Sequence, residues 1–478
     1  MLLSEWWRSV EKWLSRKHVK QRMFMEENNK GPRIGLSDTE RFPLLNDISL
    51  LHELRQDEWA PNFNFMSGDR ITAHHLQEVE QYALNIRAAR RFWDENQQPD
   101  WLEEYWESCT AEVPFYKYRS GEFRSQPCIT REDIRRQPWL FVSEKAKLND
   151  LLVYQTSGTT GAPLDVLFDP VSQACWLPQM QSILDEYGVF IGEQGRKVAI
   201  ALICSQATTL TYASLSTYLN GAGILKLNLN TAEWKDPSHP VKYLEKYNPE
   251  VLTGDPFAFM ALLKLKPGIS PKALISSAMK LNDGIKEKLE GYFNAPVLDV
   301  YSLTECRNIA VSVGNKYRAI RPELYLEIFH PEKDEPLPYG ERGELVVSGG
   351  NNPFLPLIRY RTGDFCCLKI EDGVPYLEDL GARKLTIFYS LEGAVVNTID
   401  ISRKMTSYPL SGFRLHQSEN LSLQFEGWTN EDVCGQISSD LLDIFGQVQI
   451  SIKLNSAGSD LSEKVVAYTS DFSSLGSR

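Results

Sequence analysis

The feature that most constrains the fold is an alternation of short apolar runs with helical segments between residues 150 and 310. The apolar runs resemble buried strands, and they lie at residues 151–154, 198–204, 251–253, 274–275 and 297–301. Helical segments such as residues 283–293 separate several of these runs. Because strands that alternate with helices are typical of βαβ units, the pattern predicts an α/β core with a largely parallel sheet.

Two further sequence patterns follow this core along the chain. Residues 324–329 and 344–347 predict a smaller β unit, and residues 421–425 and 448–454 alternate as half-buried strands. Between the last two, Thr429 is predicted to cap a helix that carries Glu431 and Asp432 in its first turn. Since 478 residues exceed what one hydrophobic core usually supports, we expect the chain to contain three regions. They are a helical N-terminal region of unknown role (1–105), the α/β core (106–382) and a small α+β C-terminal domain (383–478).

Composition excludes several functional classes. Lys and Arg number 51 against 63 Asp and Glu, and this acidic balance argues against a nucleic-acid binder. The chain has no uninterrupted apolar run of about 18 residues, so we expect no transmembrane segment. Residues 1–24 lack the pattern of a secretory signal and predict a basic, Trp-bearing helix, which packs on its own domain or on a membrane or partner surface.

The cysteines and histidines do not form a metal-binding pattern. The eight cysteines are scattered without a Cys-x-x-Cys pair, which is typical of reduced thiols in a cytoplasmic protein. His74, His75 and Glu78 do not have the spacing of a His-Glu-x-x-His site, so we expect surface histidines there.

A run of small and hydroxylated residues follows the first predicted strand. It consists of Thr156, Ser157, Gly158, Thr159, Thr160 and Gly161. Glycines let the backbone approach a ligand closely, and exposed N–H groups with hydroxyls form a nest for anions such as the phosphates of ATP. An ordinary flexible loop explains the run equally well when it is considered alone.

Two more segments carry polar side chains at structural boundaries. Tyr301, Thr304 and Glu305 lie at the end of a predicted strand, where open α/β sheets bind ligands, and they offer a ring face, a hydroxyl and a carboxylate for Mg²⁺. Asp364 closes the segment Pro356-Leu-Ile-Arg-Tyr-Arg-Thr-Gly-Asp364, in which a turn would present the carboxylate to vicinal hydroxyls. A capped strand end and an Asx-type turn are the simpler interpretations of these segments.

Together, in this order, the three segments resemble the signature motifs of the adenylate-forming superfamily. The third segment, with Val113-Pro-Phe-Tyr116 and Ile129-Thr-Arg-Glu-Asp-Ile134, is similar to the phenylacetate–CoA ligase branch. The likeness extends over residues 105–380. It implies an enzyme that uses ATP and Mg²⁺ to activate a carboxylic acid as an acyl-adenylate, with CoA or a carrier-protein thiol as acceptor. A homodimer is compatible with the sequence.

The resemblance also implies roles for single residues. Residues 156–161 would hold the ATP phosphates, Tyr301 the adenine, Thr304 the α-phosphate, Glu305 the Mg²⁺ and Asp364 the ribose. The remaining implied nucleotide and catalytic positions are Ser277, Ala278, Arg383 and Lys464. We expect an acyl pocket for an aromatic or hydrophobic acid at Tyr212, Phe257 and Phe259, although ordinary core aromatics explain these rings as well.

The C-terminal third departs from the family pattern. Glu463-Lys464-Val-Val replaces the usual Gly-Lys context, and Gly381-Ala-Arg-Lys-Leu-Thr386 lacks the two acidic residues of the usual hinge. Two alternatives therefore stay open: an adenylate that drives amide, ester or N–N bond formation without a thioester, and a non-catalytic nucleotide-binding relative.

Overall fold

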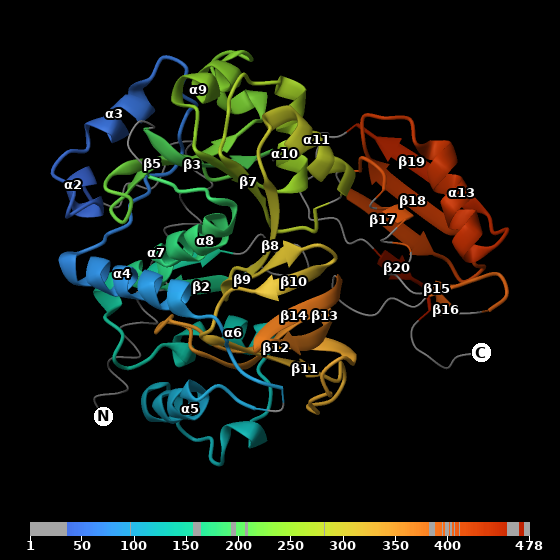
Figure 1. Ribbon diagram of the computed structural model, residues 1–478, viewed down its shortest axis with the longest axis horizontal. Helices are drawn as coiled ribbons and strands as arrows, with labels where there is room; N and C mark the ends of the chain where they lie inside the picture. The colour runs from blue at the N-terminus through green and yellow to red at the C-terminus, as the bar shows by residue number, and fades with distance from the viewer. Residues whose placement is uncertain are drawn as a thin grey trace.

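The computed structural model describes a large body and a smaller C-terminal unit (Figure 1). The described residues are 36–95, 97–155, 164–192, 197–205, 209–281, 283–381, 388–393, 395–396, 401, 404–405, 407–410, 412–456 and 468–472. In Figure 1 the smaller unit lies beside α10 (Pro256–Leu265) and α11 (Asp283–Phe293). An ion pair between Lys288 of α11 and Glu431 joins the two.

A 12-stranded sheet forms the backbone of the large body. In spatial order its strands are β11 (Leu324–Phe329), β12 (Arg342–Gly349), β13 (Leu357–Glu371), β14 (Val374–Gly381), β10 (Lys316–Ala319), β9 (Arg307–Val313), β8 (Val297–Leu303), β7 (Ala273–Ser276), β6 (Val251–Gly254), β3 (Val198–Cys204), β5 (Ala222–Asn228) and β4 (Tyr212–Ser216). The strands from β8 to β5 run parallel, whereas the other pairings are antiparallel. The predicted smaller β unit is the antiparallel half of this sheet, which the β8–β9 pair joins to the parallel half without a break.

Most of the expected core strands are confirmed. The runs at 198–204, 251–253, 274–275 and 297–301 are β3, β6, β7 and β8, and the helix expected at 283–293 is α11. These strands are apolar throughout because both faces of a parallel sheet are covered. On β7, Leu274 belongs to one core cluster and Ala273 and Ile275 to another, as the alternation of side chains along a strand requires.

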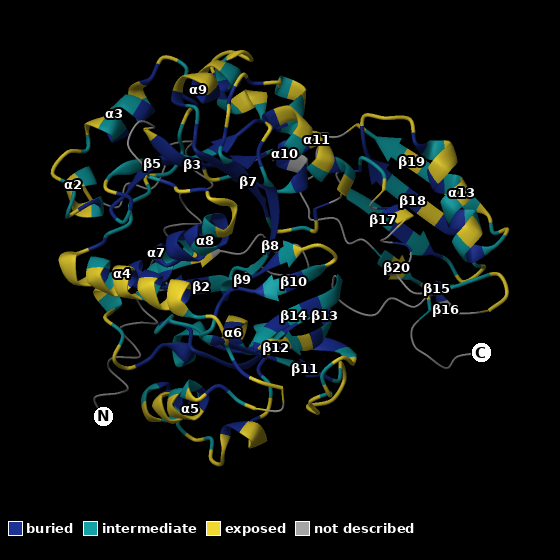
Figure 2. Cartoon of the chain, viewed as in Figure 1, coloured by how far each residue is buried: buried dark blue, intermediate teal, exposed yellow. Residues whose placement is uncertain are grey.

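Helices cover both faces of the parallel strands. One cluster contains residues from α3 (Ser49–Gln56), α9 (His239–Tyr247), α10 and α11, and the other is built on α8 (Trp176–Leu184). The remaining helices are α2 (Asp38–Arg41), α4 (Ala73–Ala88), α5 (Trp101–Glu112), α6 (Arg131–Arg136) and α7 (Pro170–Ala174), with short 3-10 turns at Phe123–Ser125, Pro138–Phe141, Leu148–Asp150, Asp185–Tyr187 and Thr231–Glu233. Figure 2 shows the burial concentrated along the strands and an exposed outer face on α4.

The described part of the N-terminal region packs on the large body. Leu51 and Leu54 of α3 lie in the core cluster of the parallel strands, and Leu102 and Trp106 of α5 lie in that of the antiparallel strands. On α4, His74 is exposed and pairs with Glu78 at 2.8 Å, as expected for a surface histidine. His75 does not fit that expectation, because it is buried and caps the first turn of α4 with Thr72.

The C-terminal unit is a small α+β domain, as predicted. Its four-stranded sheet has the order β19 (Ile450–Asn455), β18 (Leu423–Trp428), β17 (Gly412–Gln417) and β20 (Tyr468–Ser470), and a separate short pair joins β15 (Phe388–Tyr389) to β16 (Val395–Val396). The helix α13 (Cys434–Phe445) buries Ile437, Leu441 and Phe445. Its predicted start was wrong: Thr429 accepts a hydrogen bond from the Glu431 amide at 3.2 Å, but this local turn ends before the helix begins at Cys434.

Candidate active site

The phosphate-loop candidate connects the two strands of a hairpin. β1 (Leu152–Gln155) pairs antiparallel with β2 (Asp165–Phe168), and the residues between them, including the predicted 156–161, lie outside the described residues. The strand expected at 151–154 exists as β1. Its predicted place in the buried parallel core was wrong, because the apolar run of β2 supplies an antiparallel partner and leaves Tyr154 39% exposed.

The strand-end segment lies where β8 leaves the parallel sheet. Tyr301 is half-buried at the end of β8, and Thr304 and Glu305 occupy the turn that leads into β9. Glu305 is buried, with 6% of its surface exposed. The neighbouring strand β7 ends at Ser276, so Ser277 and Ala278 follow at the same edge of the sheet; Ala278 is exposed in the left-handed conformation (φ 71°).

The third segment is part of a long strand. Arg359 to Asp364 lie inside β13, whose pairing with β12 shifts register twice, so the expected free-standing turn was wrong. Local irregularity replaces it: Gly363 has φ 76°, and Thr362 Oγ1 accepts a hydrogen bond from the Asp364 amide at 3.1 Å. Such irregular backbone re-aims side chains within a sheet.

Two hydrogen bonds join the second and third segments. The Tyr301 hydroxyl donates to Asp364 Oδ2 at 2.8 Å, and the Tyr360 hydroxyl donates to Glu305 Oε1 at 2.9 Å. Glu305 Oε1 also accepts a hydrogen bond from Arg131 Nη1 at 3.0 Å. Each of the two carboxylates, Glu305 and Asp364, is therefore held by a tyrosine of the other segment.

Arg131 reaches Glu305 because its own segment runs beside β13. The Ile129 amide donates to the Arg359 carbonyl and the Arg361 amide to the Ile129 carbonyl, each at 2.9 Å. Neither Arg131 nor Tyr360 was expected to contact Glu305, although both lie in motifs that carry the family resemblance. The signal in the sequence is that Arg131 and Tyr360 stand inside these motifs. The sequence alone does not tell which carboxylate their side chains bind.

The two phenols are held as donors. Burial, followed by the nearby Asp364, raises the pKa of Tyr301 well above its usual value. Burial, followed by Glu305, does the same for the pKa of Tyr360. Both hydroxyls consequently keep their protons at neutral pH and donate to the carboxylates.

The other predicted site residues lie apart from these two segments or outside the described residues. Tyr212 is half-buried at the start of the edge strand β4, and Phe259 is fully buried in the core cluster beneath α10. Phe259 therefore exposes no ring surface to a ligand in this structure. Arg383, Lys464 and the side chain of Phe257 lie outside the described residues.

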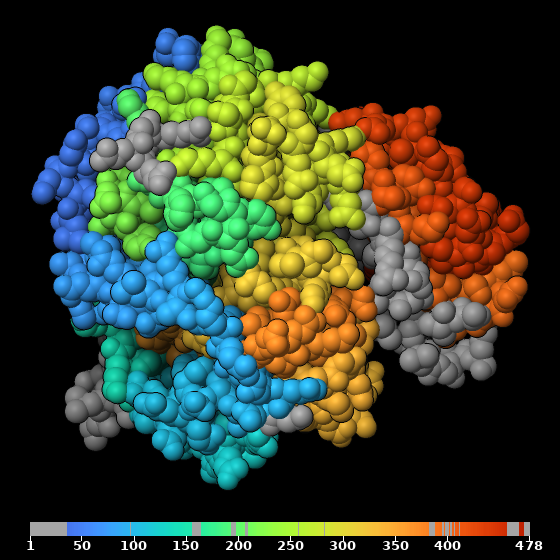
Figure 3. All heavy atoms as spheres, in the orientation of Figure 1, coloured from blue at the N-terminus to red at the C-terminus, as the bar shows by residue number. Residues whose placement is uncertain are grey.

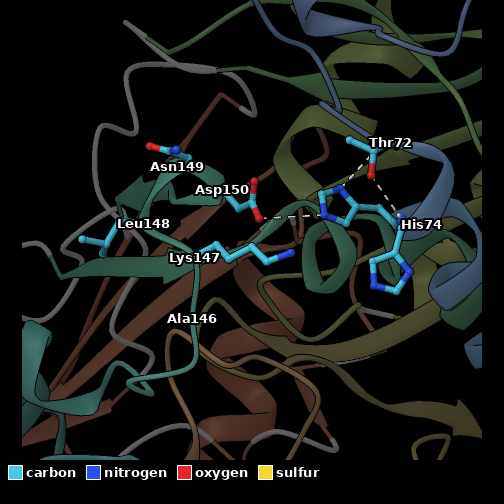
Figure 4. Close-up of a pocket in the computed structure, with 8 residues that line it drawn as sticks. Thr72, His74, Ala146, Lys147, Leu148, Asn149 and Asp150 are labelled. Carbon is cyan, nitrogen blue, oxygen red and sulfur yellow. Dashed lines mark hydrogen bonds and ion pairs between the residues drawn. The ribbon is translucent and has the colours of Figure 1, made fainter.

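The hollows among the described residues include one away from the predicted site and one beside it. The larger, of about 550 Å³, is lined by residues 146–150 and by Thr72, His74 and His75; Figure 4 shows Lys147 and Asp150 facing Thr72 and His74 across it. It contains none of the expected site residues. The other is a narrow cavity with Glu305, Arg307, Arg321 and Phe168 in its wall, so it adjoins the strand-end segment.

The described residues include no metal cluster and no membrane-spanning helix. Among them, no three His, Cys, Asp or Glu side chains gather closely enough to hold an ion by themselves. In the same part of the chain, each helix is too short or too polar to cross a bilayer. A Mg²⁺ ion does not require such a cluster, because it commonly binds one or two carboxylates together with substrate phosphates.

The chain is similar to known proteins in sequence and in fold. A family model described as AMP-binding enzyme matches residues 85–352. Protein CapK of Staphylococcus aureus is 21% identical over 363 residues, which cover 70% of this chain and 76% of that protein. A phenylacetate-coenzyme A ligase of Pseudomonas putida is 24% identical, with 53% of this chain and 61% of the ligase covered.

A solved structure shares the fold. The 2-hydroxyisobutyryl-CoA ligase, in its postadenylation state with 2-HIB-AMP, superposes with a TM-score of 0.52 at 16% identity, and the match covers 83% of this chain and 88% of that one.

Proposed function

Since the chain belongs to the AMP-binding enzyme family, we propose that it activates a carboxylic acid with ATP as an acyl-adenylate and then transfers the acyl group to the thiol of CoA. It is an adenylate-forming ligase that releases pyrophosphate and then AMP. The pairing of the two segments, through the hydrogen bonds from Tyr301 to Asp364 and from Tyr360 to Glu305, carries this proposal for the site.

The reaction poses an electrostatic problem that this site addresses. A carboxylate must approach the α-phosphate of ATP, although both are anions. Transfers at phosphorus depend mainly on positioning and charge stabilisation, so the enzyme requires no protein nucleophile. When bound, Mg²⁺ neutralises phosphate charge.

Glu305 suits a metal-binding role. Its carboxylate offers the hard oxygen donors that Mg²⁺ prefers, and the side chain is 5% exposed. Arg131 and Tyr360 fix its orientation through Oε1. Thr304, the preceding residue, supplies a hydroxyl that we assign to the α-phosphate.

Asp364 and Tyr301 form the nucleoside end of the proposed site. We assign Asp364 to the ribose hydroxyls and the Tyr301 ring to the adenine, with Ser277 and Ala278 at the neighbouring strand end. Residues 156–161 and Arg383 keep their proposed places around the phosphates and ribose. Lys464 keeps its proposed role as the cation that bridges the carboxylate and the α-phosphate.

Three finer assignments rest on the sequence. We propose an aromatic or hydrophobic body for the acid, with Tyr212 and Phe257 in its pocket, and a carrier-protein thiol as the alternative acceptor. A cytoplasmic location is supported by eight free cysteines, since thiols persist in a reducing compartment.

The test is acid-dependent exchange of labelled pyrophosphate into ATP, measured over a library of carboxylic acids. We expect exchange with at least one acid class and a loss of 100-fold or more in Glu305→Gln, on the order expected for an electrostatic catalytic group. Glu287→Gln, which changes an exposed glutamate on α11, is the matched control and should retain full activity. Tight ATP binding without exchange for any acid would overturn the proposal in favour of a non-catalytic relative.

A second measurement identifies the acceptor. With the acid that supports exchange, AMP release should rise on addition of CoA. Release that responds to amines or alcohols while CoA is inert would instead show an adenylate used for an amide or ester bond.

A further inference from the structure

Arg307 stands two residues after Glu305 and is held in an uncommon backbone conformation. It begins β9 with φ 65°, in the left-handed region that bulky side chains rarely adopt. Such a conformation is unfavourable for a residue with a Cβ atom, so the surrounding structure must hold it in place. The result is that the Arg307 side chain lines the narrow cavity beside Glu305.

Aromatic rings from the phosphate-loop hairpin surround its guanidinium group. The guanidinium carbon lies 3.9 Å from the ring centroid of Phe168 on β2 and 5.1 Å from that of Tyr154 on β1. Arg307 therefore sits between the strand-end carboxylate and the hairpin that carries the candidate phosphate loop.

The partners of this guanidinium are uncharged. Nη2 donates to the side-chain amide oxygen of Gln173, and Nε is buried without a hydrogen-bond partner. Within the described ranges, no Asp or Glu oxygen lies within 4.0 Å of Arg307.

The neighbouring arginines are treated differently. Arg321, in the wall of the same cavity, binds Glu323 at 2.7 Å, and Arg131 binds Glu305 at 3.0 Å. Arg359 on β13 binds Glu327 at 2.9 Å. Each of these three arginines forms an ion pair with a carboxylate, and Arg307 differs from them in this respect.

Arg307 is half-buried, and its Nε atom is fully buried, so the lack of a nearby anion is unfavourable. The guanidinium is charged at neutral pH, because arginine stays protonated in proteins. Desolvation of such a charge is costly unless a counter-ion and hydrogen bonds offset it. An incoming anion would satisfy both the charge and the unpartnered Nε–H.

We propose that Arg307 selects a dicarboxylic acid as the substrate, binding its second carboxylate while the first is activated near Glu305. This inference rests on the proposed function and narrows its substrate class. The Tyr154 ring, which is 39% exposed, then lies beside the body of the acid, and the acid's far end carries a charge instead of a purely apolar group.

The experiment compares matched acids in pyrophosphate exchange with the wild-type enzyme. The pairs are glutarate with pentanoate and terephthalate with benzoate. We expect kcat/KM to favour the diacid of at least one pair by about 30-fold or more, the range typical of a buried charge pair. Exchange with the monoacids alone would overturn the dicarboxylate assignment and leave the proposed function intact, whereas exchange with no acid of the library would remove both.

Variants separate recognition from a structural role. Arg307→Met should lose the preference for the diacid and retain or gain activity on the monoacid, Arg307→Lys should keep part of the preference, and Arg90→Met, at an exposed arginine, should change neither. An equal loss for both acids of a pair would mean that Arg307 only supports the fold. An increase in KM for ATP with an unchanged acid preference would assign the guanidinium to the phosphates. Because the wild-type comparison requires no variant, the proposal is still decided if Arg307→Met does not fold.

Discussion

The hydrogen bond from Tyr301 to Asp364 can be removed without removing the ring that we assign to adenine. Tyr301→Phe deletes the hydroxyl that donates to Asp364 Oδ2 at 2.8 Å and retains the aromatic face. Because the pKa of Tyr301 is raised well above its usual value, the wild-type hydroxyl donates throughout the pH range of an activity assay. The variant therefore tests the positioning of Asp364 alone.

The expected magnitude follows from the type of bond. A hydrogen bond to a charged acceptor contributes about 1.5–3 kcal/mol, and Tyr301 is half-buried, so the lower end applies. A loss of about 1.4 kcal/mol equals a tenfold change in an equilibrium constant. We thus expect KM for ATP to rise about tenfold, with kcat and KM for the acid nearly unchanged.

The assay is pyrophosphate exchange at varied ATP and at varied acid. Tyr301→Leu, which also removes the ring, should raise KM for ATP further than Tyr301→Phe. If Tyr301→Phe raises KM for the acid and leaves KM for ATP unchanged, Asp364 does not belong to the nucleotide site.

Three further predictions concern stability and pH. Burial raises the pKa of Asp299 from 3.8 to about 6, so the folded state binds this proton more tightly than the unfolded chain, and stability falls by up to about 3 kcal/mol as the pH rises from 4 to 6. Asp299→Asn should flatten that slope in urea unfolding followed by tryptophan fluorescence; identical slopes would contradict this. Gly349 has φ 102°, and an added Cβ would collide with the backbone of Glu323, so Gly349→Ala should lower stability by about 1–3 kcal/mol or more, seen as a lower thermal midpoint than wild type. Lys246 pairs with the buried carboxylate of Asp57, and Lys246→Met should reduce stability by about 1–3 kcal/mol in the same unfolding assay, with no change in KM for ATP.

The local pattern of apolar and polar residues was sufficient to predict many of the strands and helices. The apolar runs of β3 and β8 and the amphipathic period of α11 are properties of neighbouring residues, so their positions could be predicted. The start of α13 could not, because Thr429 makes a real hydrogen bond to Glu431 in a turn that is not continued as a helix. Competing local structures of this kind have similar sequence signals.

Pairing between strands required the whole molecule. The run at 151–154 has the composition of a core strand, yet it pairs with β2 in a separate hairpin. Likewise, the Thr362–Asp364 segment has the composition of a turn, and the long pairing of β13 with β12 and β14 absorbs it into a sheet. Register and partner depend on distant residues, which a local pattern does not contain.

The sequence by itself determined which chemical groups this enzyme carries: the hydroxyl-rich loop, Tyr301, Glu305 and Asp364, in an order typical of its family. Only the tertiary structure decided which of them meet. Tyr301 and Asp364 are 63 positions apart, and Arg131 and Glu305 are 174 apart. The same packing places the half-buried Arg307 against the rings of Phe168 and Tyr154, a placement that its neighbours in the chain do not reveal. The physical reason is that hydrogen bonds and ion pairs depend on distance in space, which for such separations is fixed by the path of the folded chain.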